Sequence, residues 1–273
     1  MVVFPNCKIN LGLHILQKRP DGFHDLETVF YPLPLHDALE AVQNNLSSST
    51  DIEFHCSGIA LKTLHEDNSC VKAYRLLRKD FPALPAVTMH LHKSIPSGAG
   101  LGGGSADSAF TLLLLNKKFN LELNQPKLIK YALQLGSDCP FFILNKPCFA
   151  TGRGENLEQI NIDLSSYSFV LVNPKIHINT AWAFSQLNIT PKQSSLRDAI
   201  NFPVREWSKR VTNDFEDIVF SNYKEVGEIK TRLYEQGAIY ASMTGTGSTV
   251  YGLFEKNTLP QFNFPHHYFV KFI

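Results

Sequence analysis

The chain has 273 residues, of which 44% are hydrophobic and 19% charged, and its formal net charge is +1. This composition is typical of a globular chain and excludes a disordered or fibrous one, while the length suits one large domain or two ordinary ones. Because the basic residues are dispersed, the charge gives no reason to expect a nucleic-acid partner, although base stacking on a single strand is not excluded by charge alone.

Hydrophobic runs and cysteines predict a cytoplasmic protein with reduced thiols. The longest apolar run, near residues 109–115, is far shorter than the roughly 18–20 residues that span a membrane, and the N-terminus lacks the pattern of a signal peptide. The five cysteines are widely spaced and form no C-x-x-C pair, which argues against a disulfide framework or a zinc site. We interpret His90 and His92 as same-face residues of a strand rather than as a metal pair.

The first 150 residues mix strand and helix patterns. Residues 7–15 alternate as a strand that places Lys8 and Asn10 on one face, and Pro32 and Pro34 should interrupt the extended stretch that follows. A polar loop is expected at 44–50. The remaining expected elements are a helix from Asp67 or Asn68 to 79, a strand over 86–92, helices from 105 to 119 and from Pro126 to Gly136, and short buried strands at 141–144 and 147–150.

The pattern restarts near residue 160, which is the predicted domain boundary. A strand is expected over 169–172, and Asn213 with Glu216 predicts a capping box that opens a long helical stretch ending at Gly237. Strands over 238–243 and 248–254 then flank a second glycine turn at 244–247. Paired strands with segregated helices favour the α+β class over a regular alternation of strand and helix.

A glycine-rich segment, Pro96-Ser97-Gly98-Ala99-Gly100-Leu101-Gly102-Gly103-Gly104-Ser105, follows a predicted strand and opens straight into a helix. Glycines at such a place let backbone N–H groups approach a phosphate, and the helix N-terminus adds unpaired donors and partial positive charge. The segment lacks the Gly-Lys-Ser/Thr ending of a Walker A loop, and its partial dinucleotide fingerprint lacks the acidic residue that should follow. Phosphate binding is therefore predicted, with a purely structural turn as the alternative.

This segment resembles the phosphate loop of the GHMP superfamily of kinases, which includes galactokinase and the homoserine, mevalonate and phosphomevalonate kinases. Two further segments agree in order, Lys8-Ile9-Asn10-Leu11 and Thr244-Gly245-Thr246-Gly247-Ser248. Within the superfamily the chain is most similar to the 4-diphosphocytidyl-2-C-methyl-D-erythritol kinases. Their signatures occur here as Cys7-Lys8-Ile9-Asn10-Leu11, Arg19-Pro20-Asp21-Gly22-Phe23-His24, Glu66-Asp67-Asn68, Leu135-Gly136-Ser137-Asp138-Cys139-Pro140-Phe141-Phe142 and Gly152-Arg153-Gly154-Glu155.

The resemblance implies a two-domain α+β kinase with its active site in the inter-domain cleft. An ATP-binding domain over 1–160 would have a ribosomal-protein-S5-like β/α fold, and a substrate domain over 161–273 a ferredoxin-like α/β sandwich. The implied cofactors are ATP and Mg²⁺. The implied partner is a small molecule, cytidine diphosphate-linked methylerythritol, whose 2-hydroxyl is phosphorylated in the non-mevalonate route to isoprenoids. We expect a monomer or weak homodimer, with no nucleic-acid or membrane partner.

Asp138 matches the family's catalytic aspartate, and Lys8 its catalytic lysine. A sugar-alcohol hydroxyl is a poor nucleophile at neutral pH, so a carboxylate within hydrogen-bond reach has to accept its proton, and a nearby ammonium stabilises the alkoxide-like charge. The glycine loop and the metal would supply positioning and charge neutralisation. Judged by the residues alone, a helix or turn cap is the alternative for Asp138, and a solvated strand lysine is the alternative for Lys8, against which its otherwise apolar strand speaks.

The resemblance also assigns binding residues. The nucleotide would contact Asn68, Lys93, Pro96, Gly98, Ala99, Gly100, Leu101, Gly102, Gly103, Gly104 and Ser105, with Ser105 also a candidate Mg²⁺ ligand. The substrate would contact Asn10, Phe23, His24, Thr180, Phe184 and Gly245. A helix cap for Asn68, a surface lysine for Lys93 and core packing for Trp182 and Phe184 are the alternatives. Phe23 stands where most relatives carry tyrosine, which keeps a stacking ring and loses a hydroxyl.

Two other hypotheses remain at this point. The first is a different GHMP kinase acting on a small alcohol, against which the Phe23-His24 segment speaks because cytosine recognition would have no use there. The second is a non-catalytic nucleotide sensor or a nucleic-acid binder on a related fold. The presence of both Lys8 and Asp138 favours an enzyme.

Overall fold

The computed structural model describes residues 1–44, 51–61, 65–192, 194–256, 258 and 260–273. The chain forms two compact units, each built from several stretches of sequence. Unit 1 comprises residues 1–7, 34–97 and 102–146, and unit 2 comprises residues 8–33, 98–101 and 147–273. A single domain boundary near residue 160 stays a prediction, and the loop predicted at 44–50 lies, from residue 45 on, outside the described residues.

Unit 1 contains a four-stranded sheet of order β1-β4-β6-β5, in which β5 and β6 run parallel and the other neighbours antiparallel. The strands are β1 (Val2–Val3), β4 (Ala38–Gln43), β5 (Ile52–Gly58) and β6 (Val87–Lys93). Burial alternates along β6, so that Met89 and Leu91 face the interior while His90 and His92 are exposed together, as predicted. The same period of two brings Lys93 to the buried face.

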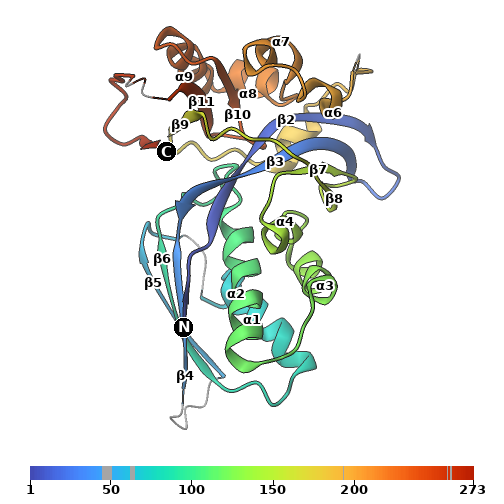
Figure 1. Ribbon diagram of the computed structural model, residues 1–273, viewed down its shortest axis with the longest axis vertical. Coiled ribbons are helices and arrows are strands. Elements are labelled where there is room, and N and C mark those ends of the chain that lie inside the picture. The colour runs from blue at the N-terminus through green and yellow to red at the C-terminus, as the bar shows by residue number, and fades with distance from the viewer. Residues whose placement is uncertain (45–50, 62–64, 193, 257, 259) are drawn as a thin grey trace. The chain divides into compact units, whose positions relative to one another are not determined.

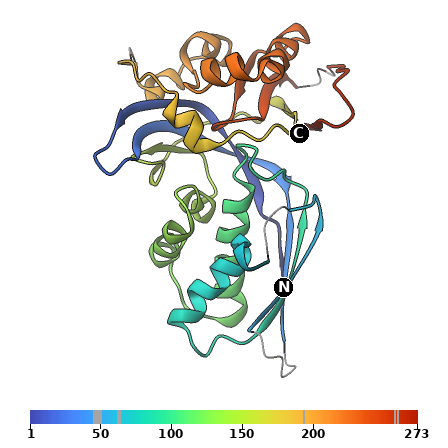
Figure 2. The ribbon, with the colours of Figure 1, turned by 180° about the vertical axis from the view of Figure 1, so that it is seen from behind.

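The helices of unit 1 pack beside this sheet, α1 against α2 and α2 also against α3 and α4 (Figures 1 and 2). They are η1 (His65–Asp67), α1 (Ser69–Asp80), α2 (Gly103–Phe119), α3 (Gln125–Leu135) and α4 (Cys139–Leu144). Asn68 caps α1 and Asn124 caps α3, each through its side-chain oxygen. The strand predicted at 141–144 is wrong: the run forms α4, because a short buried apolar run fits either structure and Pro140 suits a first helical turn.

Unit 2 contains two further sheets. The first has the order β2-β3-β7-β8, with β2 (Asn6–Lys18), β3 (His24–His36), β7 (Cys148–Thr151) and β8 (Asn156–Gln159), of which residues 8–18 and 24–33 of the long strands belong to this unit. Pro32 and Pro34 do not interrupt β3. The second sheet is antiparallel with the order β10-β11-β9-β12, formed by β9 (Tyr167–Asn173), β10 (Tyr240–Met243), β11 (Val250–Glu255) and β12 (Phe269–Phe272).

Helices cover the antiparallel sheet of unit 2, where α9 packs on β10 and β11 and runs beside α8 (Figure 1). The helices of unit 2 are α5 (Thr180–Ser185), α6 (Leu196–Ala199), the 3₁₀ helix η2 (Val204–Glu206), α7 (Trp207–Arg210), α8 (Glu216–Asn222) and α9 (Lys224–Glu235). The long helical stretch predicted to end at Gly237 is formed by two helices, α8 and α9, with Tyr223 between them. Nowhere in the described ranges is a helix both long and apolar enough to cross a membrane.

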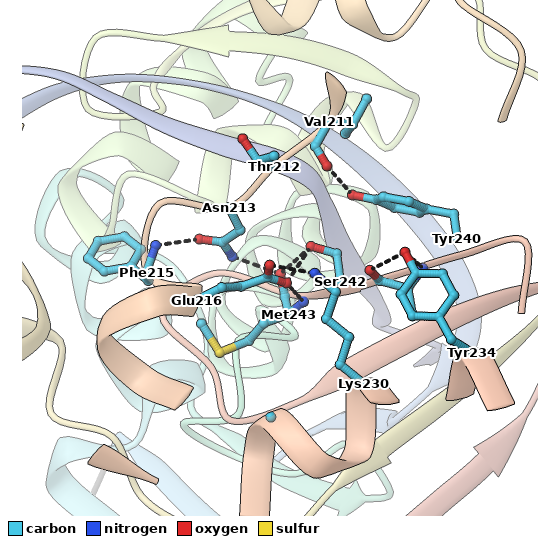
Figure 3. A network of polar contacts seen from close by, with 12 residues as sticks. Val211, Thr212, Asn213, Phe215, Glu216, Lys230, Tyr234, Tyr240, Ser242 and Met243 are labelled. Carbon is cyan, nitrogen blue, oxygen red and sulfur yellow. Dashed lines mark hydrogen bonds and ion pairs between the residues drawn. The ribbon is translucent and has the colours of Figure 1, made fainter. Parts of the chain in front are cut away.

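The predicted capping box of Asn213 and Glu216 is also wrong. The Asn213 side chain accepts a hydrogen bond from the N–H of Phe215 at 3.0 Å, and the Glu216 carboxylate turns away from the helix start toward Ser242 and Met243 (Figure 3). The sequence has the pattern of a capping box, but the Glu216 carboxylate binds Ser242 and Met243, which are distant in sequence, instead of the helix start.

A buried group of three charges joins elements of unit 1. Lys93 is 1% exposed, and its ammonium contacts the carboxylates of Asp37 and Asp107, the latter at 2.8 Å. Asp37 also accepts hydrogen bonds from the N–H groups of Ser94 and Ile95. Because one ammonium faces two carboxylates, the group cannot be neutral while all three are ionised.

The buried Asp107 makes stability depend on pH. Burial, the largest cause, raises the pKa of Asp107 from 3.8 to about 7, with the Lys93 ammonium acting in the opposite direction. The folded protein thus holds a proton that the unfolded chain releases, so its free energy of unfolding decreases as the pH rises from about 4 to about 7. Asp107→Asn removes this ionisation. We expect its melting temperature to fall less than that of the wild type between about pH 5 and about pH 8. Equal falls would contradict the assignment.

Candidate active site

Lys8 lies in a buried polar cluster of unit 2. It is 3% exposed, so the alternative of a solvated lysine is wrong. Its Nζ donates to Asn10 Oδ1 at 2.6 Å and to the Gly100 carbonyl at 3.4 Å, and it lies 4.8 Å from the centroid of the Phe30 ring. The cluster therefore fixes the position of the ammonium group relative to the glycine loop.

Asn10 fixes the position of Lys8 within this cluster. Its Nδ2 donates to Thr28 Oγ1 at 2.9 Å, which orients the amide so that Oδ1 faces the ammonium. Oδ1 also lies 3.1 Å from the Thr244 hydroxyl. Both ends of the amide are engaged by protein groups, and direct contact of Asn10 with a substrate stays a prediction.

The backbones of the two glycine segments, 96–105 and 244–247, contact each other. The Thr244 hydroxyl donates to the Gly100 carbonyl at 3.0 Å and accepts from the Asn10 N–H at 3.0 Å. Gly100 and Gly245 both have positive φ, and a Cβ placed on Gly100 would lie only 2.1 Å from the Thr244 carbonyl oxygen. Glycine is thus required at position 100 both by conformation and by this close approach.

The carbonyls of the glycine loop are bound by the protein. The oxygens of Ala99, Gly100 and Leu101 accept from the N–H of Thr249, from the Thr244 hydroxyl and from the N–H of Lys8, respectively. In a trans peptide the C=O and N–H point in opposite directions. The N–H groups of residues 100–102 therefore point away from these donors, which is the orientation that a phosphate-binding backbone needs.

In unit 1 the loop continues into α2, beside the residue that precedes α4. The N-cap of α2 is Gly102 in the left-handed conformation, so Ser105 lies in the first turn of the helix. The buried thiol of Cys139, whose pKa burial raises to about 11, is hydrogen-bonded to Ser105 and Ser108. This contact brings the start of α4, with Asp138, next to the first turn of α2.

Asp138 stands at the N-cap position of α4, but its side chain does not cap the helix. The helix-cap explanation drawn from its sequence context is therefore wrong. The half-buried carboxylate lies one residue from Cys139, at the end of unit 1 where α2 begins. Its catalytic role stays a prediction.

The flanking nucleotide candidates have structural partners of their own. Asn68 Oδ1 accepts from the N–H of Cys70 at 2.8 Å, which confirms the cap. Lys93 is not a surface lysine, because its ammonium is buried between two carboxylates. Contact of Lys93 with the nucleotide stays a prediction. Pro96 is buried directly after the residues that Asp37 holds.

The candidate substrate residues make ring contacts in unit 2, where Phe184 packs edge-on against Phe215 with centroids 4.9 Å apart. The rings of His24 and Phe184 stack with centroids 4.8 Å apart, and burial lowers the pKa of His24, so its imidazole is neutral near pH 7 and offers one donor and one acceptor. Phe23 is 48% exposed, with the Arg153 guanidinium 3.7 Å from its ring centroid. A cation on the ring face thus accompanies the phenylalanine that replaces the family's tyrosine.

Thr180 and Phe184 both belong to α5. The Thr180 hydroxyl lies 3.3 Å from that of Thr246 in the second glycine turn. Trp182 and Phe184 are two residues apart on a helix and therefore point in different directions, with Trp182 packed edge-on against Tyr223. Core packing accordingly explains Trp182.

Acidic and metal-ligating side chains do not gather into a metal centre within the described ranges: no group of three or more His, Cys, Asp or Glu residues could hold an ion. Mg²⁺ is commonly held by nucleotide phosphates, water and only one or two protein groups, and its binding by this chain stays a prediction. Ser105, in the first turn of α2, offers one hydroxyl oxygen for that purpose.

Comparison with known proteins agrees with this geometry. The family models for the N-terminal and C-terminal domains of GHMP kinases match residues 68–146 and 197–262. The chain belongs to the GHMP kinase family. It is 50% identical, over 99% of this chain and 100% of the relative, to a 4-diphosphocytidyl-2-C-methyl-D-erythritol kinase of Azobacteroides pseudotrichonymphae, and 53% identical, over 93% and 92%, to the one of Bacteroides fragilis.

A solved structure also resembles this GHMP kinase over nearly its whole length. A 4-(cytidine 5'-diphospho)-2C-methyl-D-erythritol kinase superposes with a TM-score of 0.79 at 29% identity, covering 93% of this chain and 90% of the other. The predicted two-domain GHMP kinase fold of the α+β class is thereby confirmed.

Sequence reasoning missed several residues that hold the site. Thr28 and Thr244 connect Asn10 to its surroundings, Asp37 and Asp107 hold Lys93, and Arg153 covers Phe23. Thr244 and Arg153 stand in the quoted family signatures, which are the signal that could have found them. The others are common polar residues whose partners are far away in sequence.

Two glycine-to-alanine variants of this kinase separate packing from ligand binding. A Cβ on Gly104 meets nothing within 4 Å, so Gly104→Ala should leave the melting temperature unchanged or slightly higher, since alanine favours a helix. If a phosphate occupies that space, KM for ATP should rise about tenfold or more, which corresponds to roughly 1.4 kcal/mol. Gly100→Ala should instead destabilise the fold. An unchanged KM for Gly104→Ala would contradict phosphate binding at this turn.

Proposed function

We propose that this GHMP kinase transfers the terminal phosphoryl group of ATP to the 2-hydroxyl of 4-(cytidine 5'-diphospho)-2-C-methyl-D-erythritol, a step of the non-mevalonate route to isoprenoids. The observation that carries the proposal is the fixed contact between Lys8 and the glycine loop, which sets an ammonium 3.4 Å from the Gly100 carbonyl. Relatives that match 99% and 93% of this chain and bear this kinase name support the choice of substrate.

The glycine loop fits ATP. Its carbonyls are turned into the protein, its N–H groups face the other way, and a helix N-terminus with open space at Gly104 follows. These features supply donors and partial positive charge for the β- and γ-phosphates. Mg²⁺ would accompany the phosphates and neutralise their charge, with Ser105 as a protein ligand.

Phosphoryl transfer needs little covalent chemistry from the protein. In the proposed reaction the Asp138 carboxylate accepts the proton of the attacking hydroxyl. The Lys8 ammonium stabilises negative charge on the reacting oxygens, and its anchor on Asn10 keeps it in place as the charge develops.

The aromatic residues of unit 2 suit a cytosine ring. His24 is uncharged and can exchange hydrogen bonds with the polar edge of a pyrimidine, while Phe184 and Phe23 offer stacking faces. Mevalonate and homoserine have no ring to use these contacts. The aromatic pair therefore favours the cytidyl alcohol over the smaller acceptors of other GHMP kinases.

Removing the proposed base tests the reaction. Asp138→Asn keeps the size of the side chain and removes its basicity, so turnover should fall about 10²–10⁴-fold while binding of ATP changes little. An assay coupled to ADP release, with the cytidyl alcohol, mevalonate and homoserine as acceptors, measures turnover and its dependence on ATP concentration. The exposed Asp163→Asn is the matched control and should keep full activity. Turnover of mevalonate alone, or full activity of Asp138→Asn, would overturn the proposal.

Removing the proposed cytosine contact tests the substrate. His24→Ala should raise KM for the cytidyl alcohol about ten- to a hundredfold, the loss expected from one buried hydrogen bond and one stacked ring, with KM for ATP unchanged. His36→Ala, an exposed histidine, serves as control. If His24→Ala lowers the melting temperature and leaves both KM values unchanged, His24 is a structural residue.

A further inference from the structure

Residues 211–216 of unit 2 connect the second glycine turn to the strand that carries Lys8. The Leu13 N–H donates to the Thr212 carbonyl at 2.9 Å, the Asp214 N–H to the Leu13 carbonyl at 2.9 Å, and the Ile15 N–H to the Asp214 carboxylate at 2.8 Å. These three bonds fasten the segment along β2. The segment is therefore fixed relative to Lys8 and Asn10 on the same strand.

The same segment holds Met243, the residue before the glycine turn, from both sides of its peptide (Figure 3). The Glu216 carboxylate accepts from the Met243 N–H at 2.8 Å, and Lys230 contacts its other oxygen at 2.6 Å. Asn213 Nδ2 donates to the carbonyls of Met243 and Gly245, at 2.7 and 2.8 Å. One buried amide thus donates hydrogen bonds to both carbonyls that flank Thr244.

We propose that Asn213 is a positioning residue for phosphoryl transfer, acting through Thr244 on the Gly100 carbonyl and on Asn10. By fixing the peptide groups around Thr244, it sets the direction of the hydroxyl that bonds Gly100 and faces Asn10, the group that holds Lys8. This role rests on the proposed function.

The chemistry of the site explains why an asparagine stands here. The amide offers two N–H donors for two carbonyls and one oxygen for the Phe215 N–H, and each of these contacts is made. An aspartate of the same shape would keep the acceptor and place a negative oxygen beside two carbonyl oxygens. Asn213→Asp therefore removes the hydrogen bonds to the two carbonyls while it retains the bond from the N–H of Phe215, the residue before α8.

The first test is nucleotide binding to the full chain, which does not depend on the acceptor. Asn213→Asp should weaken a non-hydrolysable ATP analogue about tenfold or more and leave adenosine unchanged within twofold, because the loop contacts phosphates only. A merely structural loss would weaken both ligands equally and would overturn the proposal. Asn124→Ala, which removes a cap in α3, is the control and should change neither affinity.

The second test is turnover of the cytidyl alcohol. Asn213→Asp and Thr244→Val should each lower kcat about ten- to a hundredfold, with KM for the alcohol within threefold of the wild type. Thr244→Ser should retain most activity. The variant that combines Asn213→Asp and Thr244→Val should be no slower than the slower of the two single variants. Multiplied losses would show independent action and overturn the proposal. If Asn213→Asp does not fold, Asn213→Ala carries the same measurements, and full activity of Thr244→Val overturns the proposal on its own. A wild type that binds ATP without turnover would count against the proposed function alone.

Discussion

The hydroxyl of Thr244 is the contact on which the arrangement of unit 2 depends. It joins the second glycine turn to the Gly100 carbonyl and to Asn10, and Asn10 holds the Lys8 ammonium. A phosphate-binding backbone has to present N–H groups, so its carbonyls need donors elsewhere. This contact and its neighbours supply those donors and, at the same time, fix the Lys8 ammonium, the cation that we propose stabilises the reacting phosphate.

The two buried lysines show how surroundings decide the role of one residue type. Lys93 lies between the carboxylates of Asp37 and Asp107, so its charge is used in joining the end of β6 to α2. Lys8 is held by an amide oxygen, a backbone carbonyl and the face of Phe30. These contacts hold the ammonium beside the carbonyl of the glycine loop, where it could stabilise negative charge that develops during a reaction.

The sequence predicted regular elements well where periodicity and caps agree. Asn68 and Gly136 mark the start of α1 and the end of α3, and the alternation over 86–92 predicted β6, although it did not predict the burial of Lys93. It failed where one pattern fits two structures, since the apolar run 141–144 became α4. The capping box failed for a different reason, since Glu216 found buried partners in Ser242 and Met243.

The sequence by itself determined the glycine loop, the lysine on its strand, the aspartate before α4 and the GHMP family, because these are carried by residue types in a fixed order. Only the tertiary structure decided that Thr244 bonds the glycine loop and Asn10, that Thr28 orients Asn10, and that Asn213 binds the carbonyls on either side of Thr244. Each is a short polar side chain whose role is set by a hydrogen-bond partner that is distant in sequence. No local pattern records such a partner, because it is the fold that brings the two together.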